Sequence, residues 1–497
     1  MRARLLGAAT AAALVLTVAV GVSPTSAAGS SPSPSPSASP SVAPSSGSTT
    51  GSATGSTSGS TTGSTTGPGT AHMMIRDKWK PPTGVAFNNP YGPFAKRYAL
   101  EHRILDAIHH TPDDGHIRIA IYSFDRVPVA KALVAAHHRG VQVQVLLNNH
   151  QVTPAQRILH RALGTDPTKK NFTYECQFSC RGHANNLHTK FYLFNRAGAA
   201  RQVIMLGSQN LTLNAVKWQW NDLYTRFGDR SQFRSYVGLF NSMRHDYSVN
   251  QPYYTFCGKP ASQGCNEAKD FMVTRVYPKN TNVNNDDIME AFNAVQCVYK
   301  DASGTVKHTH VWIAMHTWRG KRGNWLAAKV RSMWAAGCEV KVDYGLIGFQ
   351  TKQILGAVTA RGRVPLRSMG FDYNGDGQVD RYTHQKNFTI LGDWHGNKNA
   401  AVAYTGSSNF ATLGTAQDEI VVSLNSRKIV RAYNTHFMMQ WDSSRYSRDA
   451  YTTTYSNYRS TAADQIGGMP RTEVAPVKQV LNLPDHLRGG GPHWEGD

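Results

Sequence analysis

Apolar residues alternate with polar ones in short runs of this chain, and elsewhere they recur three and four positions apart. The first spacing predicts strands and the second predicts helices. Strands that alternate with helices indicate βαβ units, in which helices cover a mixed sheet. The first half is predicted to contain helices at 98–109, 129–138 and 230–246, and strands at 117–122, 141–147, 203–206 and 222–227.

The same order of elements recurs in the second half of the chain. The helices predicted there are 286–298, 325–336 and 427–441, and the strands are 311–315, 339–344, 402–404 and 419–424. An internal duplication is the simplest interpretation of this recurrence. We therefore expect an α/β fold of two pseudo-symmetric units, each a mixed β-sheet flanked by helices, packed face to face.

The N-terminal region has the pattern of an export signal. Arg2 and Arg4 precede an apolar run at 5–22, and small residues follow at 25–28. This layout is typical of a secretory signal peptide ending at residue 28, with an uncleaved signal anchor as the alternative. We expect a secreted, extracellular protein.

Composition sets the remaining boundaries. Residues 29–71 are almost entirely Ser, Thr, Pro, Gly and Ala, which predicts a flexible linker. The first unit is then expected at 72–250, a connecting segment at 251–285, and the second unit with a C-terminal extension at 286–497.

Charge and cysteine content narrow the class of protein. The 53 Lys and Arg residues exceed the 32 Asp and Glu, giving a formal charge of +21. This excess favours anionic partners such as lipid head groups, nucleic acid or other phosphate esters, although it also serves solubility alone. Six cysteines suit an oxidising destination, and without a repeated C-x-x-C pair disulfides are favoured over zinc. Proximity suggests the pairs Cys176–Cys180, Cys257–Cys265 and Cys297–Cys338.

One small set of residues occurs twice, as His-x-Lys on a predicted strand followed by Gly-Ser-x-Asn. The two copies are His188, Lys190, Gly207, Ser208 and Asn210, and His384, Lys386, Gly406, Ser407 and Asn409. A histidine can attack phosphorus or transfer a proton, and a lysine can hold phosphate oxygens. Either half-motif alone is typical of a surface histidine or a turn. Their recurrence after equivalent strands argues against that interpretation.

These motifs resemble the HxK(x)4D…GSxN pair of the phospholipase D superfamily, over roughly residues 85–445. The motif aspartate is replaced by Asn195 in the first copy and Leu391 in the second, with Asp393 two positions later. The spacing from His to Gly is also longer than usual, so an enlarged hairpin is expected. In the family, acids beyond the asparagine orient the histidines, and Asp222 and Glu419 match them.

The resemblance implies a phosphohistidine mechanism at the interface of the two units. It favours His188 as nucleophile and His384 as acid/base, although pseudo-symmetry leaves the reverse order open. It implies that the phosphate oxygens are bound by Lys190, Lys386, Asn210 and Asn409. Ser208 and Ser407 are expected to bind substrate or to position the loop. No metal or other cofactor is expected in catalysis.

A stretch before the second histidine resembles a calcium loop. Oxygen side chains at Asp372, Asn374, Asp376 and Asp380 fit the spacing of calcium ligands. The twelfth position is Thr383 instead of the bidentate Glu, so a turn that needs no ion is the alternative. If calcium binds, we expect it to stabilise the structure.

Three functions are compatible with these observations. The first is a secreted phosphoric diester hydrolase of phospholipase D type, which hydrolyses phospholipids at an anionic interface and transfers phosphatidyl groups to alcohols. The second is a secreted nuclease of the same superfamily, and the third is a non-catalytic protein that binds cell-wall polymers. Because one chain holds both motif copies, we expect a monomer.

Overall fold

The computed structural model describes residues 77–373 and 379–452 of the chain. These residues belong to one compact unit that spans 73–497. The predicted signal peptide and linker lie outside the described residues, as does the end of the C-terminal extension. In the described ranges, no helix combines the length and the apolar character needed to cross a membrane.

The first sheet has seven strands. From edge to edge they are β1 (Gly84–Phe87), β8 (Asp222–Arg226), β6 (Ala200–Gly207), β5 (Phe191–Ala197), β2 (His116–Ile121), β3 (Gln142–Asn148) and β4 (Phe172–Cys176). Strands β2, β3 and β4 run parallel, and the remaining neighbours are antiparallel. The sheet is therefore mixed, as predicted.

The second sheet repeats this order and these directions. The corresponding strands are β10 (Met272–Val276), β20 (Ile420–Asn425), β19 (Asn397–Gly406), β18 (Lys386–Trp394), β14 (His310–Trp318), β15 (Glu339–Ile347) and β16 (Leu366–Ser368). Short strands extend it, namely β9 (Tyr254–Phe256), β21 (Arg448–Asp449) and β11 (Val295–Gln296). The predicted α/β class is confirmed. Two-fold pseudo-symmetry is compatible with the repeated order and stays a prediction.

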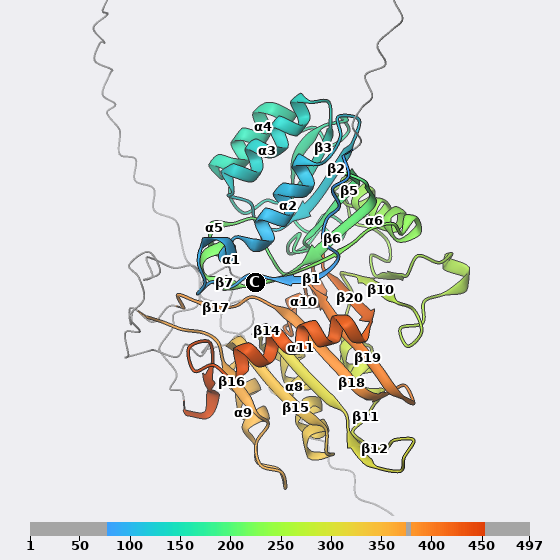
Figure 1. Cartoon of the computed structure of the whole chain (residues 1–497), viewed down its shortest axis with the longest axis vertical. Coiled ribbons are helices and arrows are strands. Elements are labelled where there is room, and N and C mark those ends of the chain that lie inside the picture. Colours follow the sequence, from blue (N-terminus) through green and yellow to red (C-terminus); the bar gives the residue numbers. More distant parts are fainter. Residues whose placement is uncertain (1–76, 374–378, 453–497) are drawn as a thin grey trace, which may run out of the picture. The chain divides into compact units, whose positions relative to one another are not determined.

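Helices cover both faces of each sheet (Figure 1). One face of the first sheet packs on α2 (Ala99–His109), α3 (Val127–His138) and α4 (Pro154–Leu163). The matching face of the second packs on α7 (Asp287–Asn293), α8 (Gly320–Ala335) and α9 (Phe349–Gly356). A third core joins the other faces of both sheets through α6 (Arg230–Met243) and α11 (Arg427–Trp441). This shared core holds the two halves together.

Short elements complete the repeat and the contact between the halves. They are α1 (Phe94–Arg97), α5 (Leu213–Lys217), α10 (Leu413–Ala416), β7 (Gln219–Trp220) and β17 (Tyr382–Thr383). Strands β7 and β17 come from different halves and pair in parallel. An isolated parallel bridge between Leu187 and Asp418 makes the corresponding contact on the other side.

Two predicted boundaries need correction. The helix expected at 286–298 ends at Asn293, because the next residues form β11 and pair with β18. The segment expected to be a connection at 251–285 supplies β9 and β10 to the second sheet. Its residues 272–276 are all buried, as a strand within a sheet requires.

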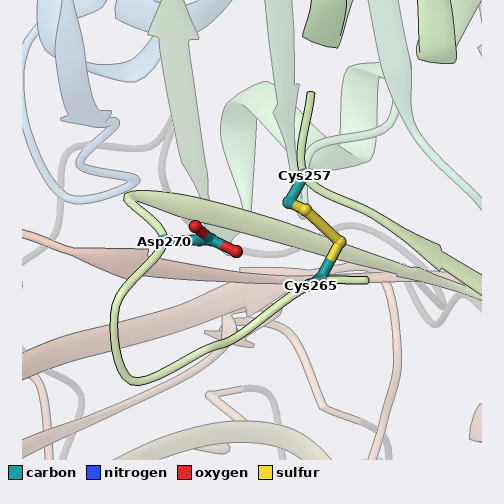
Figure 2. A group of neighbouring side chains, drawn as sticks. All are labelled: Cys257, Cys265 and Asp270. Carbon is teal, nitrogen blue, oxygen red and sulfur yellow. A yellow bond between two sulfur atoms is a disulfide. The ribbon is translucent and has the colours of Figure 1, made fainter. Parts of the chain in front are cut away.

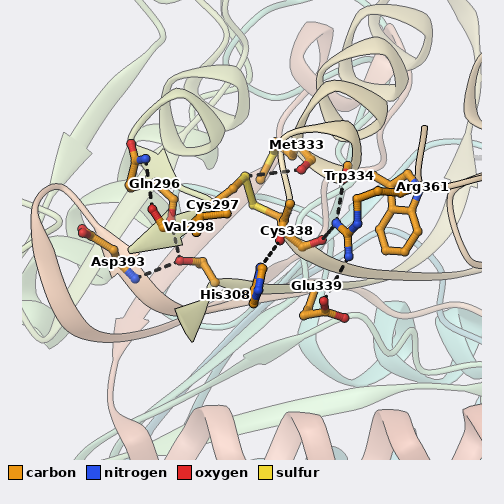
Figure 3. Close-up of a disulfide and its surroundings, with 12 residues drawn as sticks. Gln296, Cys297, Val298, His308, Met333, Trp334, Cys338, Glu339, Arg361 and Asp393 are labelled. Carbon is orange, nitrogen blue, oxygen red and sulfur yellow. Dashed lines mark hydrogen bonds and ion pairs between the residues drawn. A yellow bond between two sulfur atoms is a disulfide. The ribbon is translucent and has the colours of Figure 1, made fainter. Parts of the chain in front are cut away.

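All three predicted disulfides are confirmed. Figure 3 shows the one that joins Cys297 to Cys338. It anchors the base of a hairpin, β12 (Val298–Lys300) and β13 (Val306–His308), to the turn before β15. The guanidinium of Arg361 donates to the carbonyl of Cys338 at 2.8 Å, and His308 Nδ1 lies 2.7 Å from the carbonyl of Gly337. This hairpin is an addition of the second half.

One partly buried histidine gives the fold an acid sensitivity. His436 of α11 stacks on Phe87 of β1 at 3.8 Å, and the edge of Trp220 lies 5.5 Å away. Burial lowers the pKa of His436 to about 3. The unfolded chain takes up a proton below about pH 6.5 and the folded chain does not, so stability is lost as the pH falls from about 6.5 to about 3.

We expect His436→Phe to remove that part of the acid sensitivity, because phenylalanine keeps the stacking and has no proton to gain. The difference in unfolding free energy between pH 7 and pH 4.5 should shrink by roughly 2–3 kcal/mol. Urea unfolding of both proteins at the two pH values measures it. Equal pH sensitivity in the two proteins would contradict the partly buried, neutral imidazole.

Candidate active site

Each motif histidine is buried and is held by a side chain of the other half. His188 Nδ1 lies 2.6 Å from Glu419 Oε1, and both side chains are almost fully buried. The backbone N–H of His188 also donates to the carbonyl of Asp418 at 2.9 Å. Because a carboxylate only accepts, Nδ1 carries the hydrogen and Nε2 is the nitrogen that can react. The predicted contact of Glu419 is present.

His384 has an amide in the corresponding place. Its Nδ1 lies 2.9 Å from Asn221 Oδ1, and its backbone N–H donates to the carbonyl of Trp220 at 2.9 Å. The oxygen of Asn221 also accepts from Ser208 Oγ at 2.9 Å, and its Nδ2 faces the carbonyl of Ala215 at 3.3 Å. These partners fix which end of the amide meets the histidine. The reactive nitrogen of His384 is therefore also Nε2, and the partner of its Nδ1 is an amide in place of a carboxylate.

The sequence prediction that Asp222 orients His384 is wrong by one residue, because Asn221 makes this contact. Asp222 Oδ2 accepts from Thr405 Oγ1 at 2.6 Å and from Tyr433 OH at 2.7 Å. Burial raises the pKa of Asp222, and these hydroxyl donors act in the opposite direction. Asp222 thus links β8 to β19 and α11 and supports the site from behind.

The motif glycines define the correct register. A Cβ at Gly207 would lie 2.2 Å from the carbonyl oxygen of Asp222, and one at Gly406 would lie 2.1 Å from that of Ile420. Only glycine allows the backbones to approach so closely. Asp222 is therefore the counterpart of Ile420, and the residues just before them, Asn221 and Glu419, are the counterparts that reach the histidines.

The motif serines hold the same two segments together. The backbone N–H of Asp222 donates to Ser208 Oγ at 3.1 Å, and that of Ile420 donates to Ser407 Oγ at 3.1 Å. In return, the backbone N–H of Ser208 donates to the carbonyl of Asp222, and that of Ser407 donates to the carbonyl of Ile420. We expected these serines to bind substrate or to position the loop, and the observed hydrogen bonds serve positioning.

The lysines and asparagines repeat their contacts in both halves. Lys190 Nζ donates to the carbonyl of His188 at 2.7 Å, and Lys386 Nζ donates to that of His384 at 3.1 Å. The side-chain oxygens of the asparagines accept from the backbone N–H groups of the β2 and β14 ends, Asn210 from Ser123 and Asn409 from Thr317. With the oxygen so engaged, the NH2 group is the end that can donate to a phosphate oxygen. All four side chains are buried.

Both motif histidines and Lys190 lie before their strands, whereas Lys386 is the first residue of its strand. Strand β5 begins at Phe191 and β18 at Lys386. The preceding residues leave the sheet to make the contacts with the other half, so they are extended without belonging to their own ladder. In each half the two motif strands form a hairpin with a tight turn, around Gly198 and around Gly396. The expected enlargement of these hairpins stays a prediction.

Two aromatic neighbours of the histidines were not predicted. Tyr122 meets the ring of His188 edge-on at 5.1 Å, and Lys190 Nζ lies 5.4 Å from the centre of the Tyr122 ring. His316 occupies the corresponding position and lies 4.6 Å from the His384 ring. Register could have found them, because each lies just beyond the sheet position opposite its motif lysine.

A buried acid next to Glu419 has an altered pKa. Burial raises the pKa of Asp418 to about 7, while Arg181 and the backbone N–H groups of Cys180 and Arg181 act in the opposite direction. The N–H of Cys180 places Asp418 beside the Cys176–Cys180 disulfide, and the N–H of Asp418 itself donates to the carbonyl of Asn186 at 3.0 Å. Residues of the first half therefore hold the segment that carries Glu419 in place.

The replaced motif aspartates do not reach the histidines. Asn195 Oδ1 accepts the backbone N–H of His116 at 2.7 Å, which joins β5 to β2. Leu391 packs against the shared core, and the N–H of Asp393 donates to Thr309 Oγ1 at 3.0 Å. Both positions serve the sheet, which explains why the loss of the acid leaves the histidine contacts intact.

Among the described residues, one group of side chains places potential metal ligands close together, and it is unsuited to a metal. Figure 2 shows Cys257, Cys265 and Asp270. The two sulfurs are joined in a disulfide, so neither is a thiolate, and Asp270 pairs with Lys259.

The calcium loop lies partly outside the described residues, which exclude Asn374 and Asp376. Of the remaining positions, Asp372 and Asp380 are buried, and Asp380 Oδ2 accepts the N–H of Tyr373 at 2.7 Å. Structural calcium stays a prediction.

Comparison with known proteins gives one family match. Residues 104–236 match the model described as the PLD-like domain of cardiolipin synthase. No curated protein sequence matches the chain.

Several solved structures share parts of the fold. Polyphosphate kinase from Porphyromonas gingivalis is 13% identical over 73% of this chain, with a TM-score of 0.46, and the match spans about half of its own length, 48%. Phosphatidylserine synthase from Haemophilus influenzae is 10% identical over 74% of this chain and 88% of its own, with a TM-score of 0.46. Nuc from Salmonella typhimurium is 19% identical over 33% of this chain and 98% of its own, with a TM-score of 0.25.

Proposed function

We propose that the chain belongs to the phospholipase D superfamily, since residues 104–236 match a PLD-like domain model, and that it cleaves phosphodiesters through a phosphohistidine intermediate. The observation that carries this proposal is the pair of buried histidines, each bound at Nδ1 by a side chain from the other half. That arrangement makes Nε2 the nitrogen of each imidazole that would react. A lysine and an asparagine beside each histidine can bind the phosphate oxygens where charge develops.

The two partners suggest the order of the steps. Attack of His188 Nε2 on phosphorus forms a P–N bond and leaves a positive imidazolium, whose charge the Glu419 carboxylate offsets. The P–O bond to the leaving alcohol breaks as His384 gives its proton to that alcohol. His384 then takes a proton from water, the water oxygen attacks phosphorus, and the P–N bond breaks. An alcohol in place of water gives transphosphatidylation.

The favoured substrate is a phospholipid. The matched family model is named for cardiolipin synthase, and the excess of basic residues suits an anionic lipid surface. The three disulfides are compatible with an extracellular, secreted enzyme. Neither a catalytic metal nor another cofactor is part of this proposal, and a monomer would contain both motif copies.

A second candidate function, nucleic-acid cleavage, is favoured by a basic groove on the second half. Two adjoining hollows of about 470 and 460 Å³ share Leu391 and Arg427. Their cationic lining consists of Lys307, Lys398, Arg427 and Arg431, and His308 and His310 also line the second hollow. The acid among them, Glu339, is paired with Arg361 at 3.1 Å. Leu391 is five residues from Lys386 along β18, or roughly 16 Å, so a polyanion held there could extend to the site.

Two assays distinguish these functions. Choline release from phosphatidylcholine vesicles and nicking of plasmid DNA should be measured without added metal and again with chelator. We expect choline release in both conditions. DNA nicking without choline release would overturn the lipid assignment and support the nuclease. Inactivity on both substrates would leave the third hypothesis, a non-catalytic protein that binds wall polymers.

A further inference from the structure

A buried glutamine stands two residues before each histidine partner. Gln219 precedes Asn221 and is 0% exposed, and Gln417 precedes Glu419 and is 2% exposed. Neither was predicted as part of the site. Burying a primary amide is costly unless its donors and acceptor are bonded, so the partners of these two side chains are informative.

Each glutamine connects the histidine partner to the opposite half. Gln417 Nε2 donates to Glu419 Oε1 at 2.9 Å, and its Oε1 accepts from Asn186 Nδ2 at 3.1 Å. Asn186 lies two residues before His188. In the other half, Asn221 Nδ2 donates to Gln219 Oε1 at 3.3 Å, and Gln219 Nε2 donates to Tyr382 OH at 2.6 Å.

Tyr382 in turn lies two residues before His384. In each half, a chain of hydrogen bonds therefore starts two residues before the histidine and passes through the glutamine to the histidine partner. The partner then contacts the histidine itself, which closes the loop.

The two amides point in opposite directions, and the chemistry of the histidine partner explains why. Glu419 can only accept, so Gln417 must present its NH2 group to it. Asn221 must turn its oxygen toward the Nδ1–H of His384, which leaves its own NH2 group facing the glutamine. Gln219 must then present its oxygen. The amide of Gln417 is thus oriented to suit a carboxylate partner, and the amide of Gln219 is oriented to suit an amide partner.

We propose that Gln219 and Gln417 are positioning residues that hold Asn221 and Glu419 with an oxygen toward the Nδ1–H of each histidine. They thereby keep the hydrogen on Nδ1 and the lone pair or transferable proton on Nε2. The catalytic consequence rests on the proposed function, whereas the assignment of the imidazole hydrogen does not. If the two glutamines only filled space in the core, substitution of either one should have the same effect on activity. Because their amides point in opposite directions, the positioning role predicts different effects.

One pair of substitutions tests this difference. Gln219→Glu keeps an oxygen toward Asn221 Nδ2, and the hydroxyl of Tyr382 can donate to the new carboxylate. Gln417→Glu instead places two carboxylates together at the bond that holds Glu419. We expect Gln417→Glu to lower kcat about 100-fold with KM within about threefold, and Gln219→Glu to lower kcat by about tenfold or less.

A matched control and a substrate-free measurement complete the test. Gln232→Leu removes a similarly buried glutamine of α6, which donates to the carbonyl of Met272 at 2.8 Å and not to a histidine partner. It should lower Tm without changing kcat or the pH profile. The ¹⁵N chemical shifts of the His188 imidazole should report Nδ1–H in the unsubstituted protein and in Gln219→Glu, and a mixture of tautomers in Gln417→Glu.

The outcomes separate the two proposals. Absence of phosphodiesterase activity in the unsubstituted protein would overturn the proposed function, and the ¹⁵N shifts would still decide the positioning role. Equal losses of kcat in the two glutamate variants, or His188 shifts that are the same in all proteins, would overturn the positioning role. A 100-fold loss confined to Gln417→Glu together with the altered tautomer supports it.

Discussion

A phosphodiester with an acidic phenol as leaving group should release that phenol once from His384→Ala and not at all from His188→Ala. Such a leaving group departs without a proton, so the variant that lacks the acid can still form the phosphohistidine. It cannot complete the cycle, because water then attacks without a base. His188→Ala lacks the atom that bonds to phosphorus.

The measurement combines rapid kinetics with the mass of the protein after mixing. We expect a burst of about one phenol per chain from His384→Ala, together with a mass increase of one phosphoryl-ester group. On an alkyl ester both variants should lose turnover on the order of 10⁴-fold. The exposed His138 on α3 supplies the control, since His138→Ala should behave like the unsubstituted protein. A burst from His188→Ala alone would reverse the two roles, and full activity in either variant would overturn the mechanism.

The second large effect is expected at Glu419. Glu419→Gln should lower turnover on the order of 10³- to 10⁴-fold, because the neutral amide no longer offsets the charge on the phosphorylated imidazole. The new NH2 group also competes for the place of the oxygen that accepts from Nδ1. Initial rates across a range of substrate concentrations measure the loss, which should fall in kcat.

Asn221→Asp is the matched change in the other half. A carboxylate beside His384 favours its protonated form, so activity should persist to higher pH than in the unsubstituted protein. The loss at the optimum should be within about tenfold, since the oxygen that meets Nδ1 is retained. Equal losses for Glu419→Gln and Asn221→Asp would contradict the different roles of the two histidines.

Much of the fold could be predicted from the sequence because it is encoded locally. The helix at 427–441 matches α11, and the strand at 339–344 lies within β15, since the apolar period identifies both. The prediction that one helix continues to residue 298 was wrong. Residues 295 and 296 pair with β18 and Cys297 forms a disulfide, and these interactions outweigh the helical spacing of the apolar residues. The disulfides were predictable because each pair is near in sequence.

The site was predictable as far as the motifs extend. The partner of His384 was missed by one residue, since matching acids selects Asp222. Equal spacing from the glycine selects Trp220 instead, because α5 is one residue longer than α10. Only the close approach of Gly207 to the Asp222 backbone identifies Asn221. The glutamines were missed for the same reason, since their role depends on contacts between distant segments.

The unequal partners of the two histidines have a genetic consequence. In an enzyme assembled from two identical chains, one codon supplies the residue behind both histidines, and a mutation there changes both at once. Here Asn221 and Glu419 are encoded separately, so either can change while the other is conserved. A single chain that carries both motif copies can therefore keep a carboxylate behind one histidine and an amide behind the other.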